Sequence, residues 1–242
     1  MRPVGYPTGF LPGEPMSFHA YCLTGTDGPG PTTPVTKELC HFNDAFQLDV
    51  RRTDLKRLDA PGLVTEFGAV SSAPTGLAEM QFVMNHLDGP GTGMPLSWIY
   101  WGGTDPAYRR ELARSYPQAV AGDVLDFSFD PDTGAMTLTY AAHNATATAT
   151  NTTTTTTTNN VKAANPPTNL SLSALVYPAG YDVQTEPEDC CDVEKTAVGA
   201  SVVVKESFFA RRQQRELSGG SGGSGTDDDG AIITIRVVNA TS

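Results

Sequence analysis

The fold is decided by residues 61–69, which read PGLVTEFGA. The apolar run within this stretch predicts a short strand that ends near Glu66. In folds with parallel strands, the carboxyl ends of the strands form the active site, so a carboxylate at this position is a candidate for catalysis. The alternative interpretation is a strand-end glutamate that caps the next helix or meets a salt-bridge partner.

Strands and helices alternate on both sides of this stretch. Before it, residues 16–21 predict a short strand and residues 36–58 predict a helix. The apolar face expected for this helix consists of Leu39, Phe42, Phe46 and Val50. The basic residues expected on its solvated side are Arg51, Arg52, Lys56 and Arg57.

A second helix, a strand and a short helix come after the stretch. The second helix is marked by Leu77, Met80, Met84 and Leu87. Residues 96–101 predict the third strand, and a short helix is expected near residues 107–114. This order of elements implies parallel strands that are joined by crossover helices.

Beyond Pro117 the apolar period changes to two. Strands are predicted at residues 125–129, 136–140, 170–176, 198–204 and 231–238. Short strands without helices between them predict an antiparallel β-sandwich. We therefore expect an α/β domain over residues 1–117 and an all-β domain over residues 118–242.

Two low-complexity segments interrupt the predicted sandwich. The segment near residues 144–168 includes seven consecutive threonines, and the segment near residues 211–230 contains SGGSGGSG. Sequence of this kind cannot bury enough apolar surface to fold. Both segments are therefore expected to be disordered insertions.

The composition excludes several classes of function. The formal net charge is −11, whereas a protein that binds nucleic acid needs a basic surface. The sequence has no run of 18 apolar residues, so no membrane-spanning helix is expected. The cysteines have no metal-ligand spacing, and we expect neither a metal nor a cofactor.

The cysteines are expected to be buried free thiols. Cys22 and Cys40 could pair with each other, whereas a bond between the adjacent Cys190 and Cys191 would be strained. Four Asn-x-Ser/Thr sequons weigh toward the secretory pathway or the extracellular space rather than the cytoplasm.

Three successive predicted strands end in side chains that suit sugar chemistry. These ends carry His19 and Tyr21, then Glu66, then Trp101. A tyrosine hydroxyl can hold a carboxylate, a histidine can hydrogen-bond a sugar hydroxyl, and a tryptophan face can stack on a pyranose ring. The set suits a retaining glycosidase, in which a carboxylate attacks the anomeric carbon. For His19 and Trp101 taken singly, filling of the core is the alternative.

Several motifs resemble a known enzyme family. The segments SFHAYC (17–22), LVTEFGA (63–69) and SWIYW (97–101) resemble the last third of the (β/α)8 barrel of glycoside hydrolase family 5. The segments that resemble its endoglycoceramidase-like branch, in which a β-sandwich follows the barrel, are TEFGA (65–69), RSYPQAVAG (114–122), FDPDTG (129–134) and YPAGYDV (177–183).

The resemblance implies a fold, a reaction and a role for each site residue. The fold would be the C-terminal portion of a TIM barrel, about strands six to eight, followed by the sandwich. Glu66 resembles the nucleophile, Tyr21 the residue that hydrogen-bonds it, His19 a residue of the active-site floor and Trp101 the sugar-stacking residue. The reaction would be hydrolysis of the bond between sugar and ceramide in a glycosphingolipid, or of another lipid-linked β-glucoside, with contact to a membrane surface.

The sequence departs from the family pattern in one important respect. The family's acid/base glutamate follows an asparagine on the fourth barrel strand, and this chain has no Asn-Glu pair. A full barrel takes about 250 residues. We therefore expect the C-terminal part of a longer enzyme, inactive alone. The alternatives are a non-catalytic module that binds carbohydrate or lipid, a truncated fragment, or a family 5 glucanase that acts on a soluble polysaccharide.

Overall fold

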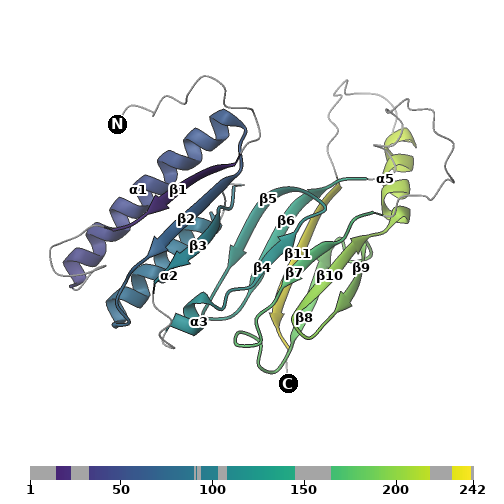
Figure 1. The fold of residues 1–242 in the computed structure, drawn as a ribbon. Helices are drawn as coiled ribbons and strands as arrows, with labels where there is room; N and C mark the ends of the chain where they lie inside the picture. Colours follow the sequence, from purple (N-terminus) through teal and green to yellow (C-terminus); the bar gives the residue numbers. More distant parts are fainter. Residues whose placement is uncertain are drawn as a thin grey trace, which may run out of the picture. The chain divides into compact units, whose positions relative to one another are not determined.

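The chain divides into two compact units, Met1–Leu112 and Ala113–Ser242 (Figure 1). The computed structural model describes residues 15–22, 33–89, 91, 94–102, 108–144, 165–218 and 231–240. The first unit contains a sheet with helices and the second consists mainly of strands, as the sequence predicts. The domain limits expected from the sequence, 1–117 and 118–242, remain predictions.

The first unit contains a three-stranded parallel sheet in the order β1-β2-β3. The strands are β1 (Met16–Ala20), β2 (Gly62–Gly68) and β3 (Ser97–Trp101). The helices are α1 (Pro34–Leu58), α2 (Pro74–Asp88) and α3 (Arg109–Leu112). The predicted alternation of strands and helices is confirmed, whereas closure of these strands into an eight-stranded barrel remains a prediction.

The helix α1 begins at a capping box. The Thr36 N–H donates to Thr33 Oγ1 at 3.2 Å, and the Thr33 N–H donates to Thr36 Oγ1 at 2.9 Å. These two bonds satisfy backbone donors that the first turn of a helix leaves without partners. Pro34, at the first helical position, has no N–H to satisfy.

The predicted apolar face of α1 is wrong. Leu39, Phe42 and Phe46 are 56%, 74% and 46% exposed. Leu48 and Leu55 are fully buried instead, and they pack in one core with Val64 and Phe67 of β2 and with Met80, Met84 and Leu87 of α2. At about 100° per residue, Leu39 and Phe46 project from the side of the helix opposite to Leu48. The face of α1 that carries the large apolar residues Leu39, Phe42 and Phe46 is therefore the exposed face.

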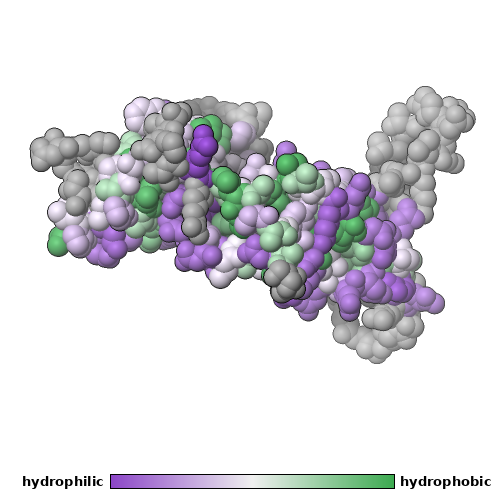
Figure 2. Space-filling view, turned by 90° about the horizontal axis from the view of Figure 1, so that it is seen from below, coloured by the Kyte–Doolittle hydropathy of each residue, from purple (hydrophilic) through white to green (hydrophobic). Residues whose placement is uncertain are grey.

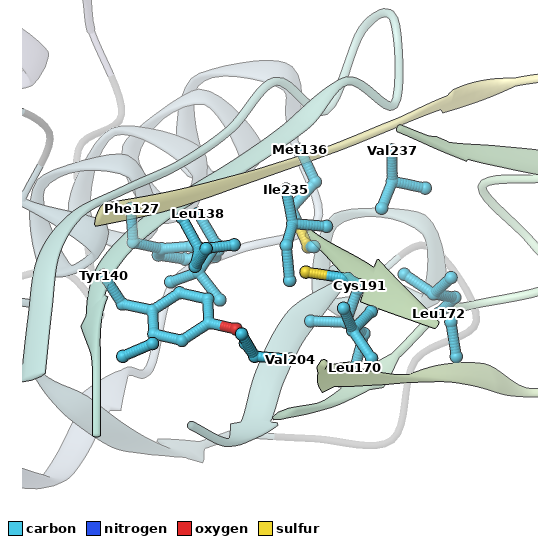
Figure 3. Packing of buried hydrophobic residues seen from close by; sticks show 14 of the residues in the cluster. Phe127, Met136, Leu138, Tyr140, Leu170, Leu172, Cys191, Val204, Ile235 and Val237 are labelled. Atoms are coloured by element: carbon cyan, nitrogen blue, oxygen red, sulfur yellow. The ribbon is translucent and has the colours of Figure 1, made fainter. Parts of the chain in front are cut away.

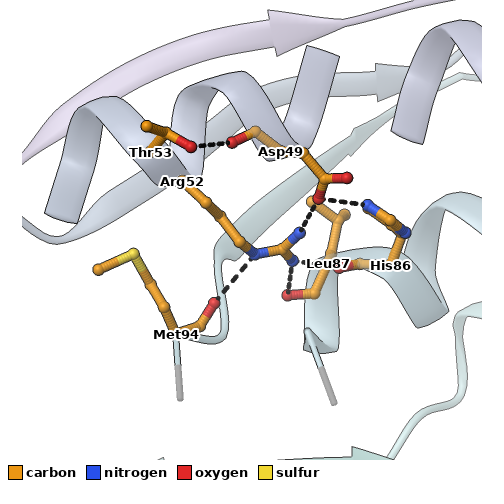
Figure 4. A network of polar contacts seen from close by, with 6 residues as sticks. All are labelled: Asp49, Arg52, Thr53, His86, Leu87 and Met94. Atoms are coloured by element: carbon orange, nitrogen blue, oxygen red, sulfur yellow. Dashed lines mark hydrogen bonds and ion pairs between the residues drawn. The ribbon is translucent and has the colours of Figure 1, made fainter. Parts of the chain in front are cut away.

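Arg52 also departs from its expected position on a solvated face. It is 4% exposed, and its Nε donates to the carbonyl oxygen of Met94 at 3.2 Å (Figure 4). Its guanidinium also donates to the carbonyls of His86 and Leu87, at the end of α2. Asp49 accepts from Arg52 at 3.5 Å and contacts His86 Nε2 at 3.0 Å. The network joins α1 to α2 and to the segment before β3, which explains why a buried arginine is tolerated.

The second unit contains two four-stranded sheets with antiparallel pairing, in the orders β4-β7-β10-β9 and β5-β6-β11-β8. The first sheet consists of β4 (Tyr116–Ala119), β7 (Thr168–Ser171), β10 (Gly199–Val204) and β9 (Cys191–Lys195). The second consists of β5 (Gly122–Phe129), β6 (Met136–Ala142), β11 (Ala231–Asn239) and β8 (Tyr181–Glu186). This arrangement agrees with the predicted antiparallel sandwich, although the sequence did not predict β4, β8 and β9.

Side chains from both sheets share one core (Figure 3). Alternate residues of β6 and β11 face inward, and the most deeply buried are Met136, Leu138, Tyr140, Ile233, Ile235 and Val237. They form a cluster with inward residues of the other sheet, which include Leu170, Val202 and Val204. The period-two pattern that predicts these strands thus corresponds to their burial.

A helix occupies part of the predicted second insertion. The helix α5 (Glu206–Ser218) runs into the range 211–230, which the sequence analysis expects to be disordered. Its sequence ESFFARRQQREL is rich in residues of good helix propensity, and Phe208 and Phe209 pack against the sandwich core. Residues 145–164 and 219–230 lie outside the described part of the chain, and so does most of the first expected insertion.

The prediction of free thiols is wrong. Cys22 is bonded to Cys40, and Cys190 is bonded to Cys191. The Cα atoms of the first pair lie 5.1 Å apart, within the range that a disulfide spans. The partners of this pair lie 18 residues apart in the sequence, so folding of the α1 segment against β1 is what brings them together.

The described helices include none long and apolar enough to cross a membrane. On the face of the molecule shown in Figure 2, hydrophobic residues form small groups among hydrophilic ones. Contact with a membrane surface, which the sequence motifs led us to expect, remains a proposal.

Candidate active site

A bulge in β2 turns Glu66 away from the helix-covered core. Val64 and Phe67 are both fully buried in that core, although they are three positions apart and a regular strand alternates its sides every residue. The ladder with β1 shifts register between Phe18 and His19, and the ladder with β3 shifts between Val64 and Phe67. An extra residue at Thr65–Glu66 accounts for both shifts, and bulges of this kind re-aim side chains near active sites.

Two side chains of the neighbouring strand contact the Glu66 carboxylate. The Tyr21 hydroxyl donates to Glu66 Oε2 at 2.9 Å, and His19 Nδ1 lies 3.3 Å from the same oxygen. The side chains of His19 and Glu66 are 54% and 37% exposed, so solvent or a ligand reaches both. The alternative that His19 fills the core is wrong.

Trp101 completes the group. It is the last residue of β3 and 56% exposed, which excludes a core-filling role for it as well. Its ring meets the ring of Tyr21 edge to face, with centroids 6.3 Å apart. The structure thus gathers His19, Tyr21, Glu66 and Trp101 at the carboxyl ends of three adjacent strands, where the sequence analysis expects them.

Tyr21 acts as a hydrogen-bond donor over a wide pH range. Burial, the hydrogen bond to Glu66 and the negative charge of that carboxylate together raise the pKa of Tyr21 to about 12. The phenol therefore stays protonated at neutral pH and continues to hold one oxygen of Glu66. The other carboxylate oxygen has no such contact in the described residues and is the one available to react.

A second group of ionisable residues lies between α1 and α2 and was not predicted. Glu79 of α2 has a side chain only 2% exposed, and its Oε2 lies 3.1 Å from His41 Nε2. Asp44 of α1 interacts with Glu79, and both acids line a small cavity behind the strand ends. The signal in the sequence was weak. The spacing of three residues from Gly76 and four from Val83, which are both buried, places Glu79 on the buried face of α2.

Burial and the neighbouring acid determine the protonation of this group. Burial first, then the hydrogen bond and charge of Asp44, raise the pKa of Glu79 to about 9. Burial also raises the pKa of Asp44 and lowers the pKa of His41. At neutral pH we therefore expect Glu79 to hold a proton and to share it with Asp44, beside a neutral His41.

Glu79→Gln is expected to stabilise the first unit by about 3–5 kcal/mol at pH 8, at about 1.4 kcal/mol for each pH unit above 4.5, with little effect in acid. The folded state keeps a proton on Glu79 up to about pH 9, whereas the unfolded chain releases it near pH 4.5. Folding stability is therefore lost as pH rises between these values, and glutamine removes this loss. Denaturant unfolding followed by tryptophan fluorescence reads the first unit alone, because the chain's 2 tryptophans both lie in β3.

Glu38→Gln is the matched control for this prediction. Glu38 lies on α1 with its side chain 73% exposed, and its charge is the smallest of the contributions to the raised pKa of Glu79. Its removal should therefore change the pH dependence of unfolding much less than Glu79→Gln does. An equal loss of stability with rising pH in the wild-type protein and in Glu79→Gln would contradict the assigned protonation.

Among the residues that the structure describes, no cluster of three or more His, Cys, Asp or Glu side chains could hold a metal ion. The strand-end group itself offers a carboxylate, a phenol, an imidazole and an indole ring. A carboxylate with one oxygen held by a phenol and an exposed indole beside it can attack a sugar whose ring stacks on that indole.

Comparison with known proteins identifies the second unit. Residues 114–211 match the sequence model of the glycoside hydrolase family 5 C-terminal domain. The chain is related to the endoglycoceramidase-like branch of glycoside hydrolase family 5. The resemblance seen in the sequence motifs is therefore confirmed.

Two endoglycoceramidases are similar to this chain. Endoglycoceramidase I of Rhodococcus hoagii is 29% identical over 139 residues, which cover 54% of this chain. The endoglycoceramidase of Cyanea nozakii is 26% identical over 122 residues, which cover 41% of this chain. These matches span 23% and 24% of the relatives' own lengths, so the chain matches about a quarter of each.

A solved structure shares the fold. The sterylglucosidase 1 of Cryptococcus neoformans aligns with a TM-score of 0.51 over 84% of this chain, at 14% sequence identity. The alignment covers 32% of the sterylglucosidase chain. At this identity the likeness concerns the fold only.

Proposed function

We propose that this chain is the C-terminal part of a retaining β-glycosidase that cleaves a sugar from a lipid, with Glu66 as the nucleophile. The observation that carries the proposal is the contact of one Glu66 oxygen with both the Tyr21 hydroxyl, at 2.9 Å, and His19, at 3.3 Å. A carboxylate held in this way at an exposed strand end is oriented for attack on an anomeric carbon.

The reaction follows from this placement. Glu66 attacks the anomeric carbon, the lipid alcohol leaves, and a glycosyl ester forms on the carboxylate. Water then cleaves the ester, which frees the sugar and restores the Glu66 carboxylate. Tyr21 remains a neutral donor throughout, since its pKa is about 12. His19 would hold a sugar hydroxyl, and Trp101 would stack on the sugar ring.

A retaining mechanism also needs a second carboxyl group about 5 Å from the nucleophile. The polar partners of Glu66 in the described part of the chain are Tyr21 and His19. This chain lacks the Asn-Glu pair of the family pattern, and we therefore assign the acid/base role to a residue of the complete protein outside this chain. For the same reason the chain by itself is expected to be inactive.

The similarity to endoglycoceramidases favours a glycosphingolipid substrate, cleaved at the bond between sugar and ceramide. A steryl glucoside is the second lipid substrate to test, because the fold is shared with a sterylglucosidase. A preference of the complete protein for a soluble glucan over both lipids would place it with the family 5 glucanases instead.

The two disulfides bear on the compartment. Bonds such as Cys22–Cys40 form and persist mainly in oxidising compartments. They support the secretory pathway or the extracellular space as the location, in agreement with the expectation drawn from the sequons.

The assignment of the nucleophile is tested by covalent labelling of the complete protein. A glucose-configured cyclic epoxide should react with Glu66, whose carboxylate opens the ring to form an ester while the epoxide oxygen takes up a proton. Peptide mass mapping should then locate the adduct on Glu66, and excess glucosylceramide should protect against it. Inactivation with the adduct on another residue would overturn the assignment.

A further inference from the structure

The disulfide Cys22–Cys40 lies directly beside the residue that holds Glu66. Cys22 follows Tyr21 in the sequence, and Cys40 is fully buried on α1. The bond therefore links the end of the first strand covalently to the helix that covers the sheet. It also contributes to the small cavity behind the strand ends, which Cys22 lines together with Ala20 and Phe67.

Tyr21 stands beyond the part of β1 that the sheet holds in place. The strand ends at Ala20, and its last register pair joins Ala20 to Phe67 of β2. Within the described residues, the Tyr21 hydroxyl hydrogen-bonds Glu66. The Tyr21 ring makes edge contacts with the rings of His19 and Trp101, each with centroids 6.3 Å apart. These contacts act at the tip of a side chain whose backbone has left the ladder.

We propose that the Cys22–Cys40 bond positions Tyr21 on the Glu66 carboxylate, so that both cysteines are positioning residues for the nucleophile. The bond fixes the backbone one residue after Tyr21 to a buried point on α1. Without the disulfide, Tyr21 and Cys22 would follow the last hydrogen-bonded pair of β1 with no covalent anchor. Holding the phenol on Glu66 would then cost conformational entropy. The proposal rests on the function proposed for Glu66.

The ionisation of Tyr21 reports this contact in the chain itself. Tyr21 keeps a pKa of about 12 only while its ring stays partly buried against Glu66. If the ring is released, its pKa should fall toward the ordinary value of about 10. At pH 10.5 the ionised fraction of Tyr21 should then rise from about 3% to about three quarters.

The experiment is NMR of the chain labelled with carbon-13 at the tyrosine ζ position, at pH 10.5. Tyr21→Phe assigns the signal. The double variant Cys22→Ser/Cys40→Ser should show Tyr21 largely ionised, whereas the wild-type protein should show it neutral. The double variant Cys190→Ser/Cys191→Ser is the matched control, because it removes the disulfide of the second unit and should leave Tyr21 neutral.

Two results would overturn the proposal. One is a Tyr21 that stays neutral in the Cys22→Ser/Cys40→Ser variant. The other is loss of the tryptophan fluorescence signature of the folded first unit in that variant, since the bond would then support the whole unit rather than Tyr21. The titration requires no hydrolysis, so its outcome is independent of whether Glu66 is the nucleophile.

A double-mutant cycle on the kcat of the complete protein adds a second test. A general loss of stability would not produce the non-additive change in kcat that the proposal predicts. Tyr21→Phe and the Cys22→Ser/Cys40→Ser pair should each lower kcat by about 10-fold, and their combination should lower it no further. Multiplied effects, about 100-fold in the combined variant, would show that the disulfide acts apart from Tyr21 and would contradict the proposal.

Discussion

Glu66→Gln in the complete protein is expected to lower kcat for glucosylceramide by about 10⁴-fold or more. An amide cannot attack the anomeric carbon, so the glycosyl ester does not form. The substitution should leave the fold intact, because the amide oxygen of glutamine still accepts the hydrogen bond that Tyr21 donates at 2.9 Å. Initial rates with the lipid in micelles, compared with the wild-type protein, give the measurement.

Two further variants make this result specific. Tyr21→Phe removes a single hydrogen bond to a charged group and should lower kcat by only about 10-fold. Glu38→Gln changes a carboxylate that is 73% exposed on α1 and should leave kcat unchanged. Substantial turnover by a folded Glu66→Gln protein would move the nucleophile to another residue and would refute the proposed mechanism.

The elements that the sequence predicts well are those with a buried and periodic face. The helix α2 was expected from Met80, Met84 and Leu87, which are all at most 1% exposed. The strands β6 and β11, with alternate residues buried, were expected from period two. Where a single face meets a core, the apolar period of the sequence is the period of the backbone.

The strands that the sequence did not predict are at the edges of their sheets. In the orders β4-β7-β10-β9 and β5-β6-β11-β8, the unpredicted β4, β8 and β9 hold three of the four edge positions. Their exposed and polar sequences, such as YDVQTE in β8 and CDVEK in β9, lack a clear alternation. An edge strand pairs on one side only, and charged residues there discourage further pairing. Its pattern is therefore weak for a physical reason.

The candidate site was predictable in composition but not in geometry. Residues at the carboxyl ends of adjacent parallel strands must lie near one another, which is why Tyr21, Glu66 and Trp101 could be grouped from the sequence. The bulge at Thr65–Glu66, which aims the carboxylate away from the core, depends on the register of two ladders at once. The pairing of Asp44 with Glu79 depends in the same way on how α1 packs on α2, which a single sequence does not reveal.

The two faces of α1 lead to the second large prediction. Leu48→Ala is expected to destabilise the first unit by about 2–5 kcal/mol, because Leu48 is fully buried among residues of the sheet and α2. Phe42→Ala removes a larger side chain but should change stability by no more than about 0.5 kcal/mol, since Phe42 is 74% exposed. Denaturant unfolding followed by tryptophan fluorescence compares the two variants directly.

The comparison is informative because the apolar pattern and the structure favour opposite outcomes. The pattern places Phe42 inside and Arg52 on the surface, whereas the structure exposes Phe42 and buries Arg52 together with Asp44. Their partners, Glu79 for Asp44 and the carbonyls at the end of α2 for Arg52, make that burial tolerable. A large loss of stability in Phe42→Ala with a small one in Leu48→Ala would mean that α1 packs through its other face. The contact between His41 and Glu79, and with it the protonation assigned to Glu79, would then have to be abandoned as well.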